Sequence, residues 1–132
     1  MNCLIVEDDD ISSQVLQKMV SLHGRFDAVD NGKKAGALFR QAHESKRPYD
    51  VVLMDIMLPG GDGLQSVREI RETETLLGIP KLHRAKVIMT TALDDPRTLM
   101  KALYESDADS YLIKPISLHR LEEELRTLKL VQ

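Results

Sequence analysis

The sequence predicts an α/β protein with a five-stranded parallel sheet and helices on both of its faces. Three observations support this prediction. Short apolar runs alternate with amphipathic stretches along the 132 residues, and apolar residues between the runs repeat at helical spacing. The runs themselves are apolar at consecutive positions, which is typical of parallel strands buried on both sides. The length and the balance of 42% hydrophobic and 30% charged residues fit one globular domain, residues 1–132.

Five segments are expected to be strands. The first covers residues 3–6 (CLIV), and the second, short and weakly apolar, covers residues 26–29 (FDAV). The third, fourth and fifth follow at residues 50–55 (DVVLMD), 87–89 (VIM) and 111–113 (YLI). A helical pattern separates each strand from the next, so we expect right-handed crossovers that make neighbouring strands parallel.

Five helices are expected, each marked by apolar residues on one face. Their inner faces are expected at Ile11, Val15, Met19 and Leu22; at Ala35, Leu38, Phe39 and Ala42; at Leu64, Val67 and Ile70; at Leu99, Ala102 and Leu103; and at Leu118, Leu121, Leu125 and Leu128. Gly24 would end the first helix, and Pro96 would lie in the first turn of the fourth. The third helix is expected to end near residue 73, and residues 74–85 to form a solvated loop, with a partner-binding surface as the alternative.

Charge and cysteine content argue against several classes of protein. A net charge of −3 is unlike that of nucleic-acid-binding surfaces, so we expect no direct contact with nucleic acid. Cys3 is the one cysteine and lies in an apolar run, where we expect a buried, unreactive thiol. No stretch is long and apolar enough to cross a bilayer, and the N-terminus lacks the features of a secretory signal. We therefore expect a cytoplasmic protein without a membrane contact.

Polar side chains follow four of the five predicted strands. They are Glu7 and Asp8 after the first, Asp55 at the end of the third, Thr90 and Thr91 after the fourth, and Lys114 after the fifth. The carboxyl ends of parallel strands meet at one edge of the sheet, where open α/β sheets bind ligands. Three carboxylates in one cleft repel each other. A divalent cation such as Mg²⁺, which prefers oxygen ligands, would relieve that repulsion.

Four motifs in this order resemble the receiver domain of two-component response regulators. They are LIVEDD (4–9), VVLMDIMLPGGDG (51–63), VIMTTA (87–92) and YLIKP (111–115). Each motif alone is weak, but together they span essentially the whole chain. The resemblance implies a flavodoxin-like, doubly wound (βα)5 fold with strand order 2-1-3-4-5.

The resemblance also implies a role for each acid at the predicted site. Asp8 and Asp55 would bind Mg²⁺ directly, Glu7 would act mostly through bound water, and the backbone carbonyl of Met57 would complete the protein's ligands. Asp55 would be the nucleophile that takes a phosphoryl group from a phosphohistidine. Lys114 would offset charge on the phosphoryl oxygens.

The same resemblance implies a switch. Thr91 would turn inward to the phosphoryl group, and we choose it over Thr90 because the family places this hydroxyl directly before a small residue, here Ala92. Tyr111 would change rotamer with the switch, and the Lys114–Pro115 peptide would be cis. Among the other acids, we expect Asp9 and Asp10 at the surface, one of them capping the first helix.

Two further positions tune phosphoryl lifetime in the family, and here they are Met57 and Leu93. Both are apolar and neither can orient an attacking water molecule, so we expect slow self-dephosphorylation. In the turn before the fifth strand, where many receivers have glycine, this chain has Ser106 and Asp107. Asp tolerates a left-handed backbone better than most residues, so the turn is expected to form.

The chain ends with its last predicted helix, so we expect a stand-alone receiver that signals through its own surface. The expected phosphoryl donor is a sensor histidine kinase or a histidine phosphotransfer protein. The expected output face is formed by the fourth helix, the fifth strand and the fifth helix, with Met100 and Tyr104 as candidate contacts. The sequence is compatible with both a monomer and a homodimer.

Three other functions are alternatives to that of a phosphoacceptor. A phosphatase with an aspartyl nucleophile needs a second Asp two residues after the first, where this chain has Met57. A flavodoxin-like cofactor binder needs a phosphate cradle after the first strand, where acids would repel a phosphate. A receiver that takes no phosphate and acts only in docking remains the main alternative. In all of these readings except the phosphatase, the protein is not a turnover enzyme.

Overall fold

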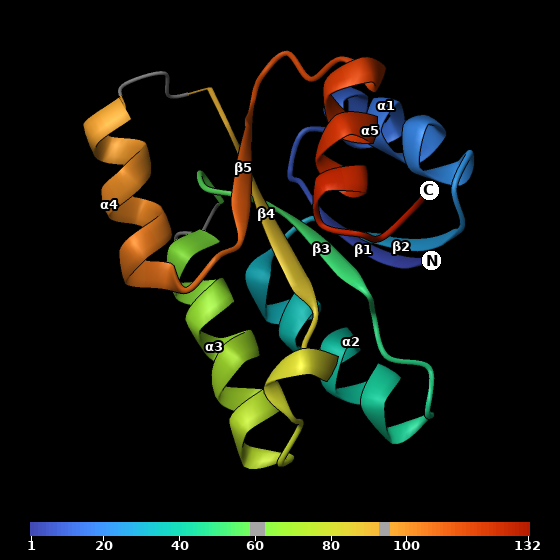
Figure 1. Cartoon of the computed structure of the whole chain (residues 1–132), viewed down its shortest axis with the longest axis vertical. Helices are drawn as coiled ribbons and strands as arrows, with labels where there is room; N and C mark the ends of the chain where they lie inside the picture. Colours follow the sequence, from blue (N-terminus) through green and yellow to red (C-terminus); the bar gives the residue numbers. More distant parts are fainter. Residues whose placement is uncertain (59–62, 93–95) are drawn as a thin grey trace.

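The computed structural model describes residues 1–58, 63–92 and 96–132, without the side chains of residues 96 and 98. One sheet contains all five strands: β1 (Asn2–Val6), β2 (Arg25–Val29), β3 (Val51–Asp55), β4 (Lys86–Thr91) and β5 (Ser110–Ile113). Every pairing is parallel and the order is β2-β1-β3-β4-β5 (Figure 1). The predicted fold class and strand order are confirmed.

Helices cover both faces of the sheet. They are α1 (Asp10–Ser21), α2 (Gly32–Glu44), α3 (Gly63–Leu76), α4 (Pro96–Ser106) and α5 (Leu118–Thr127), with a short 3-10 helix at Lys81–His83. Figure 1 shows α1 and α5 together on one side of the sheet and the other three helices on the opposite side. The sheet thus lies between two helical layers, as a doubly wound topology requires.

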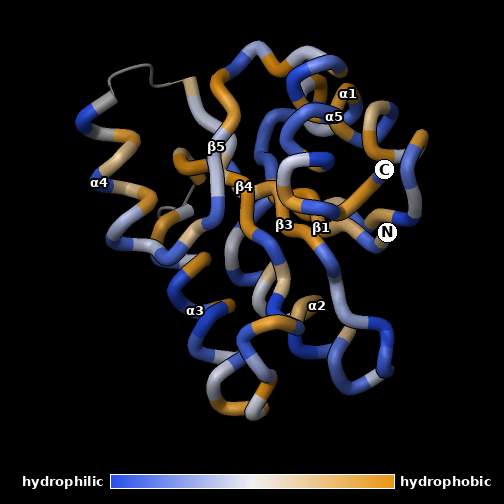
Figure 2. The backbone as a smooth tube through the Cα atoms, in the orientation of Figure 1, coloured by the Kyte–Doolittle hydropathy of each residue, from blue (hydrophilic) through white to orange (hydrophobic). Residues whose placement is uncertain are grey.

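Each face of the sheet has its own hydrophobic core, and β3 contributes to both. Val51 and Leu53 face α1 and α5, while Val52 and Met54 face the other layer. All four are at most 1% exposed. Successive side chains of a strand point to opposite faces, so burial on both sides requires the unbroken apolar run seen in the sequence. Figure 2 shows that the central strands are hydrophobic, whereas edge strand β2 is largely exposed.

The inner face of α1 differs from the predicted one. The buried residues are Ser13, Leu16 and Val20, while Ile11 is 74% exposed and Val15 44% exposed. Of the other predicted inner residues, Leu22 is exposed and Met19 is half-buried. Two apolar stripes run along this helix one residue apart, and both fit a helical period. The stripe that contains Leu16 packs in the core shared with α5 and the sheet, whereas Ile11 and Val15 of the other stripe remain exposed and Met19 reaches only the edge of that core.

The prediction of a solvated loop at 74–85 is wrong at its beginning. Helix α3 continues to Leu76, and Glu74 is fully buried. Its carboxylate accepts hydrogen bonds from Arg71 Nη1 at 2.9 Å and from the backbone N–H of Ala85 at 2.8 Å. Arg71 also donates to the carbonyl of Asp107 and to the carboxylate of Asp109. We call Arg71, Glu74 and Asp109 the Arg71 network; it joins α3 to the amino ends of β4 and β5.

Three local predictions are confirmed. Asp107 has a left-handed φ of 59° in the turn before β5, and the Lys114–Pro115 peptide is cis. Asp9 caps α1, since its carboxylate accepts a hydrogen bond from the Ser12 backbone at 2.8 Å. This bond lowers the pKa of the Asp9 carboxyl below its ordinary value. Within the described ranges, no helix is both long and apolar enough to span a membrane.

The Arg71 network should be a large contributor to stability. Arg71→Ala would leave the buried Glu74 carboxylate without its cation, and we expect a loss of about 3–5 kcal/mol in the free energy of unfolding. Urea denaturation measures this loss. Lys34→Ala, which removes an exposed ion pair with Asp30, is the control and should cost less than about 1 kcal/mol. Equal effects of the two substitutions would contradict the prediction.

Candidate functional site

Three carboxylates converge at the carboxyl ends of the strands, as the sequence predicted. Glu7 and Asp8 directly follow β1, and Asp55 is the last residue of β3, the neighbour of β1 in the sheet. Each offers one oxygen atom, and these three atoms lie within 4.8 Å of one another. Glu7 is 2% exposed and Asp55 4% exposed, whereas Asp8 lies at the surface. We call Glu7, Asp8 and Asp55 the acid cluster.

Lys114 supplies a positive charge to the acid cluster from the far edge of the sheet. Its backbone N–H donates to the Thr91 carbonyl at 2.7 Å, which fixes the chain just after β5. From there the ammonium donates to Glu7 Oε1 at 2.5 Å and to Asp55 Oδ2 at 3.2 Å. The Lys114 side chain therefore crosses the end of β4 and binds carboxylates from both β1 and β3.

The pKa values of Glu7 and Lys114 are both raised, for different reasons. Burial raises the pKa of the Glu7 carboxyl, and the neighbouring Asp55 carboxylate raises it further, while Lys114 opposes both effects. Burial alone would lower the pKa of Lys114, but its contacts with Glu7 and Asp55 outweigh burial and raise it. The ammonium is therefore held in its charged form, where it offsets part of the negative charge of the acid cluster.

The segment after Asp55 is held close to this residue. Asp55 Oδ1 accepts a hydrogen bond from the Met57 backbone N–H at 3.0 Å, and the Gly63 N–H donates to the Ile56 carbonyl at 2.8 Å. A Cβ atom on Gly63 would lie 2.0 Å from the Asp55 carbonyl oxygen, so only glycine allows α3 to begin here. Asp55 is thus fixed by backbone contacts, and the Met57 carbonyl as a metal ligand stays a prediction.

Thr91 and Tyr111 lie on the opposite face of the sheet from Lys114. Thr91 is fully buried at the end of β4 and pairs with Ile113. Tyr111 pairs with Met89, which precedes Thr91 by two residues on β4. It is half-buried against the core that faces α3 and α4. The switch that the sequence predicts for Thr91 and Tyr111 stays a prediction. Leu93 lies outside the described residues.

Two features of the site were not predicted from the sequence. One is the direct contact between Lys114 and Glu7, which nothing in the sequence indicated beyond their opposite charges. The other concerns Thr90, which was expected at this strand end: its hydroxyl is buried and has no hydrogen-bond partner in the described part of the chain, and the residue is 1% exposed. Strand periodicity could have indicated that Thr90 shares a face with Asp55, because the two residues pair directly across β3 and β4.

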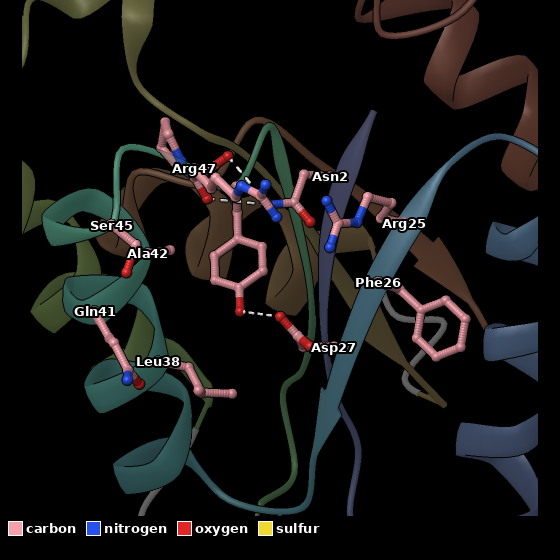
Figure 3. A pocket seen from close by; sticks show the side chains of 11 residues that line it. Asn2, Arg25, Phe26, Asp27, Leu38, Gln41, Ala42, Ser45 and Arg47 are labelled. Carbon is pink, nitrogen blue, oxygen red and sulfur yellow. Dashed lines mark hydrogen bonds between the residues drawn. The ribbon is translucent and has the colours of Figure 1, made fainter.

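A hollow of about 490 Å³ lies at the other end of the sheet, away from the acid cluster (Figure 3). It lies between β2 and α2, and two of its lining residues are joined by a hydrogen bond in which the Tyr49 hydroxyl donates to the Asp27 carboxylate at 2.5 Å. Arg25 and Arg47 lie on its rim. None of the residues predicted for the site lines this hollow.

The acid cluster has the donor chemistry of a site for a hard divalent cation. All its side-chain donors are carboxylate oxygens from two adjacent strand ends, and such oxygens are the preferred ligands of Mg²⁺. Two of the three are nearly buried, which raises the cost of keeping them ionised together. Glu7, Asp8 and Asp55 are therefore the side chains that would hold the ion, with Lys114 competing for two of them.

A model of the response regulator receiver domain family matches residues 3–126, and the chain belongs to this family. Among curated relatives, the transcriptional regulatory protein PcoR of Escherichia coli is 36% identical over 127 residues, which cover 95% of this chain and 50% of PcoR. Probable histidine kinase 2 of Oryza sativa subsp. indica is 33% identical over 93% of this chain and 12% of the kinase. This chain thus spans half or less of the relatives named here.

Solved structures agree with this assignment. The receiver domain of the histidine kinase CKI1 from Arabidopsis thaliana, crystallised with Mg²⁺ and BeF3⁻, superposes with a TM-score of 0.83 at 26% identity over 98% of this chain and 90% of that one. The CheY-like receiver from Methylobacillus flagellatus gives a TM-score of 0.74 at 28% identity over 97% and 98% of the two chains. The protein is therefore a receiver domain of a two-component system.

Removing Lys114 should make the protein more dependent on a metal ion. Lys114→Ala leaves Glu7 and Asp55 without their shared cation, so we expect a loss of about 2 kcal/mol in the metal-free protein. Millimolar Mg²⁺ should then raise the melting temperature of this variant more than that of the wild type, because the ammonium no longer competes for the acids. Thermal unfolding with and without MgCl₂ measures both effects. Equal responses of variant and wild type to Mg²⁺ would rule out this competition.

Proposed function

We propose that Asp55 accepts a phosphoryl group from a phosphohistidine, on a histidine kinase or a histidine phosphotransfer protein. A bond forms between a carboxylate oxygen of Asp55 and phosphorus as the bond between phosphorus and the histidine nitrogen breaks, and that electron pair returns to the imidazole. The observation that carries the proposal is the placement of Asp55, nearly buried between two further carboxylates and in contact with the Lys114 ammonium. Carboxylate nucleophiles of this kind form aspartyl phosphates.

Charge compensation is the main catalytic contribution expected of this site. Mg²⁺, when bound, would neutralise charge on the transferring phosphoryl group. Glu7 and Asp8 would hold that ion beside Asp55, and Lys114 would stabilise phosphoryl oxygens from the β5 side. The chain is a phosphoacceptor in this proposal and not a turnover enzyme, because Met57 brings no acid–base group to the position two residues after Asp55.

An apolar hollow beside the acid cluster would receive the phosphoryl donor. It has a volume of about 350 Å³ and is lined in part by Ile11, Val15, Pro115 and Ile116. Lys114 also lines it, so a partner that covers this surface comes close to the site. In the solved complex of the phosphotransfer protein Ypd1 with the Ssk1 receiver, which resembles this chain with a TM-score of 0.79 at 26% identity, a receiver binds such a donor.

The output face would be formed by α4, β5 and α5. Met100 is 63% exposed and Tyr104 90% exposed on α4, so two large side chains are available to a downstream protein or to a second copy of this chain. Thr91 and Tyr111 would link this face to Asp55. The proposal also includes a cytoplasmic location, because the expected kinase partner would act there.

Asp55 should be the one residue that takes up phosphate. Incubation of the wild type with acetyl phosphate and Mg²⁺ should add the mass of one phosphoryl group, and Asp55→Asn should add none. Chelation of Mg²⁺ should also prevent the addition. Intact-mass spectrometry measures these outcomes. An unmodified wild type under these conditions would favour the docking module that takes no phosphate.

The phosphoryl group should be long-lived. The Met57 side chain is 66% exposed next to Asp55 and cannot bind an attacking water molecule. Met57→Asn supplies an amide that can orient water, so we expect several-fold faster decay of the phosphoryl group, measured by mass after the phosphodonor is removed. Met57→Leu is the control and should leave the decay rate near that of the wild type. Equal decay in all three proteins would show that this side chain does not set the lifetime.

A further inference from the structure

The Thr90 hydroxyl is a buried polar group that the proposed function does not use. The residue is 1% exposed, and its Oγ1 has no hydrogen-bond partner in the described part of the chain. A valine would fill the same space without desolvating a hydroxyl, and a buried polar atom left unpaired has a cost in stability. The Thr90 hydroxyl therefore has hydrogen-bonding capacity that no group in the described part of the chain uses.

The strand register places Thr90 on the face of the sheet that the Lys114 side chain crosses. Thr90 pairs with Asp55 on one side and with Leu112 on the other. Paired residues of neighbouring strands share a face of the sheet, and Lys114 follows Leu112 by two positions, so all of them lie on the same face. To reach Asp55 on β3 from the end of β5, the Lys114 side chain must pass over β4 at Thr90.

The Lys114 ammonium reaches farther than Asp55 in this structure. Its contact with Glu7 takes it toward β1, three strand spacings of about 4.8 Å from β5. If Glu7 is engaged by a cation, the ammonium loses this partner and withdraws toward β4. An ammonium group has three N–H donors, and a threonine hydroxyl has free acceptor capacity. Rotation of Thr90 about χ1 exchanges its hydroxyl with a methyl group of similar size, so the oxygen can turn without new space.

We infer that Thr90 is a positioning residue whose hydroxyl accepts a hydrogen bond from the Lys114 ammonium once that ammonium leaves Glu7. The hydroxyl would then hold Lys114 beside Asp55, ready to contact the phosphoryl group. This inference rests on the proposed phosphoryl transfer to Asp55. It assigns to Thr90 a role separate from that of Thr91, whose side chain lies on the other face of the sheet.

The matched substitutions are Thr90→Val, which removes the hydroxyl and keeps the shape, and Thr90→Ser, which keeps the hydroxyl. In the metal-free protein, Thr90→Val should raise the melting temperature by about 3 °C or more, because an unpaired buried hydroxyl is removed. Thr75→Val, at an exposed site on α3, is the control and should not raise it. A hydroxyl with a purely structural role would give the opposite result, a lower melting temperature for Thr90→Val.

The rate of phosphorylation should fall in Thr90→Val, although the melting temperature of this variant rises. With acetyl phosphate and saturating Mg²⁺, Thr90→Val should be phosphorylated about tenfold more slowly than the wild type, the loss of one hydrogen bond to a charged group. Thr90→Ser should stay within about twofold of the wild-type rate. The increase in melting temperature caused by Mg²⁺ and beryllofluoride together should also be smaller for Thr90→Val than for Thr90→Ser.

Lys114→Ala tests whether the hydroxyl acts through the ammonium. In that background Thr90→Val should change the phosphorylation rate by less than about twofold, because the partner is gone. The same tenfold loss in both backgrounds would overturn the inference, as would a wild-type rate for Thr90→Val alone. A wild type that takes up no phosphoryl group would overturn the proposed function and this inference together, so the two failures are distinguishable.

Discussion

The structure depends on the balance of charge where β1, β3 and β5 end. Two nearly buried carboxylates and a third exposed one lie within reach of a single cation, and the Lys114 ammonium already supplies part of that positive charge. The strand order 2-1-3-4-5 makes this possible because it places the acids on adjacent strands and sends Lys114 across the intervening one. The fold thus brings residues that are far apart in sequence close enough for their charges to interact.

Backbone contacts fix the acceptor, while its cation is carried by a long side chain. Asp55 is held by the Met57 N–H and by the close approach of α3 at Gly63. Lys114 instead reaches the acids through four methylene groups, so its ammonium can exchange partners without a movement of the sheet. A site built in this way keeps the Asp55 carboxylate in place and allows the Lys114 ammonium to move as the negative charge near it changes.

Most of the fold could be predicted from the sequence because burial on two faces leaves a strong signal. A strand that is buried on both faces needs apolar side chains at consecutive positions, and the run of Val51, Val52, Leu53 and Met54 meets this need. The inner face of α1 could not be predicted, since the stripe of Ile11 and Val15 and that of Leu16 and Val20 have the same period.

The burial of Glu74 could not be predicted from the sequence either. Glu74 resembles a surface acid in the sequence, and only its hydrogen bonds with Arg71 and Ala85 explain why it is buried. The acids and Lys114 were predicted as a group because strand ends gather at one edge. Their pairing was not predictable, since it depends on where a flexible lysine ends.

The Arg71 network also bears on how the domain can deform. It fastens the backbone just before β5 to α3 and β4 through Asp107 and Asp109. The other end of β5 carries Lys114, whose ammonium contacts Glu7 and Asp55 of the acid cluster. Both ends of β5 are thus held by backbone contacts, at Asp107 before the strand and at Lys114 after it, so that the Lys114 side chain can move while the strand stays in place.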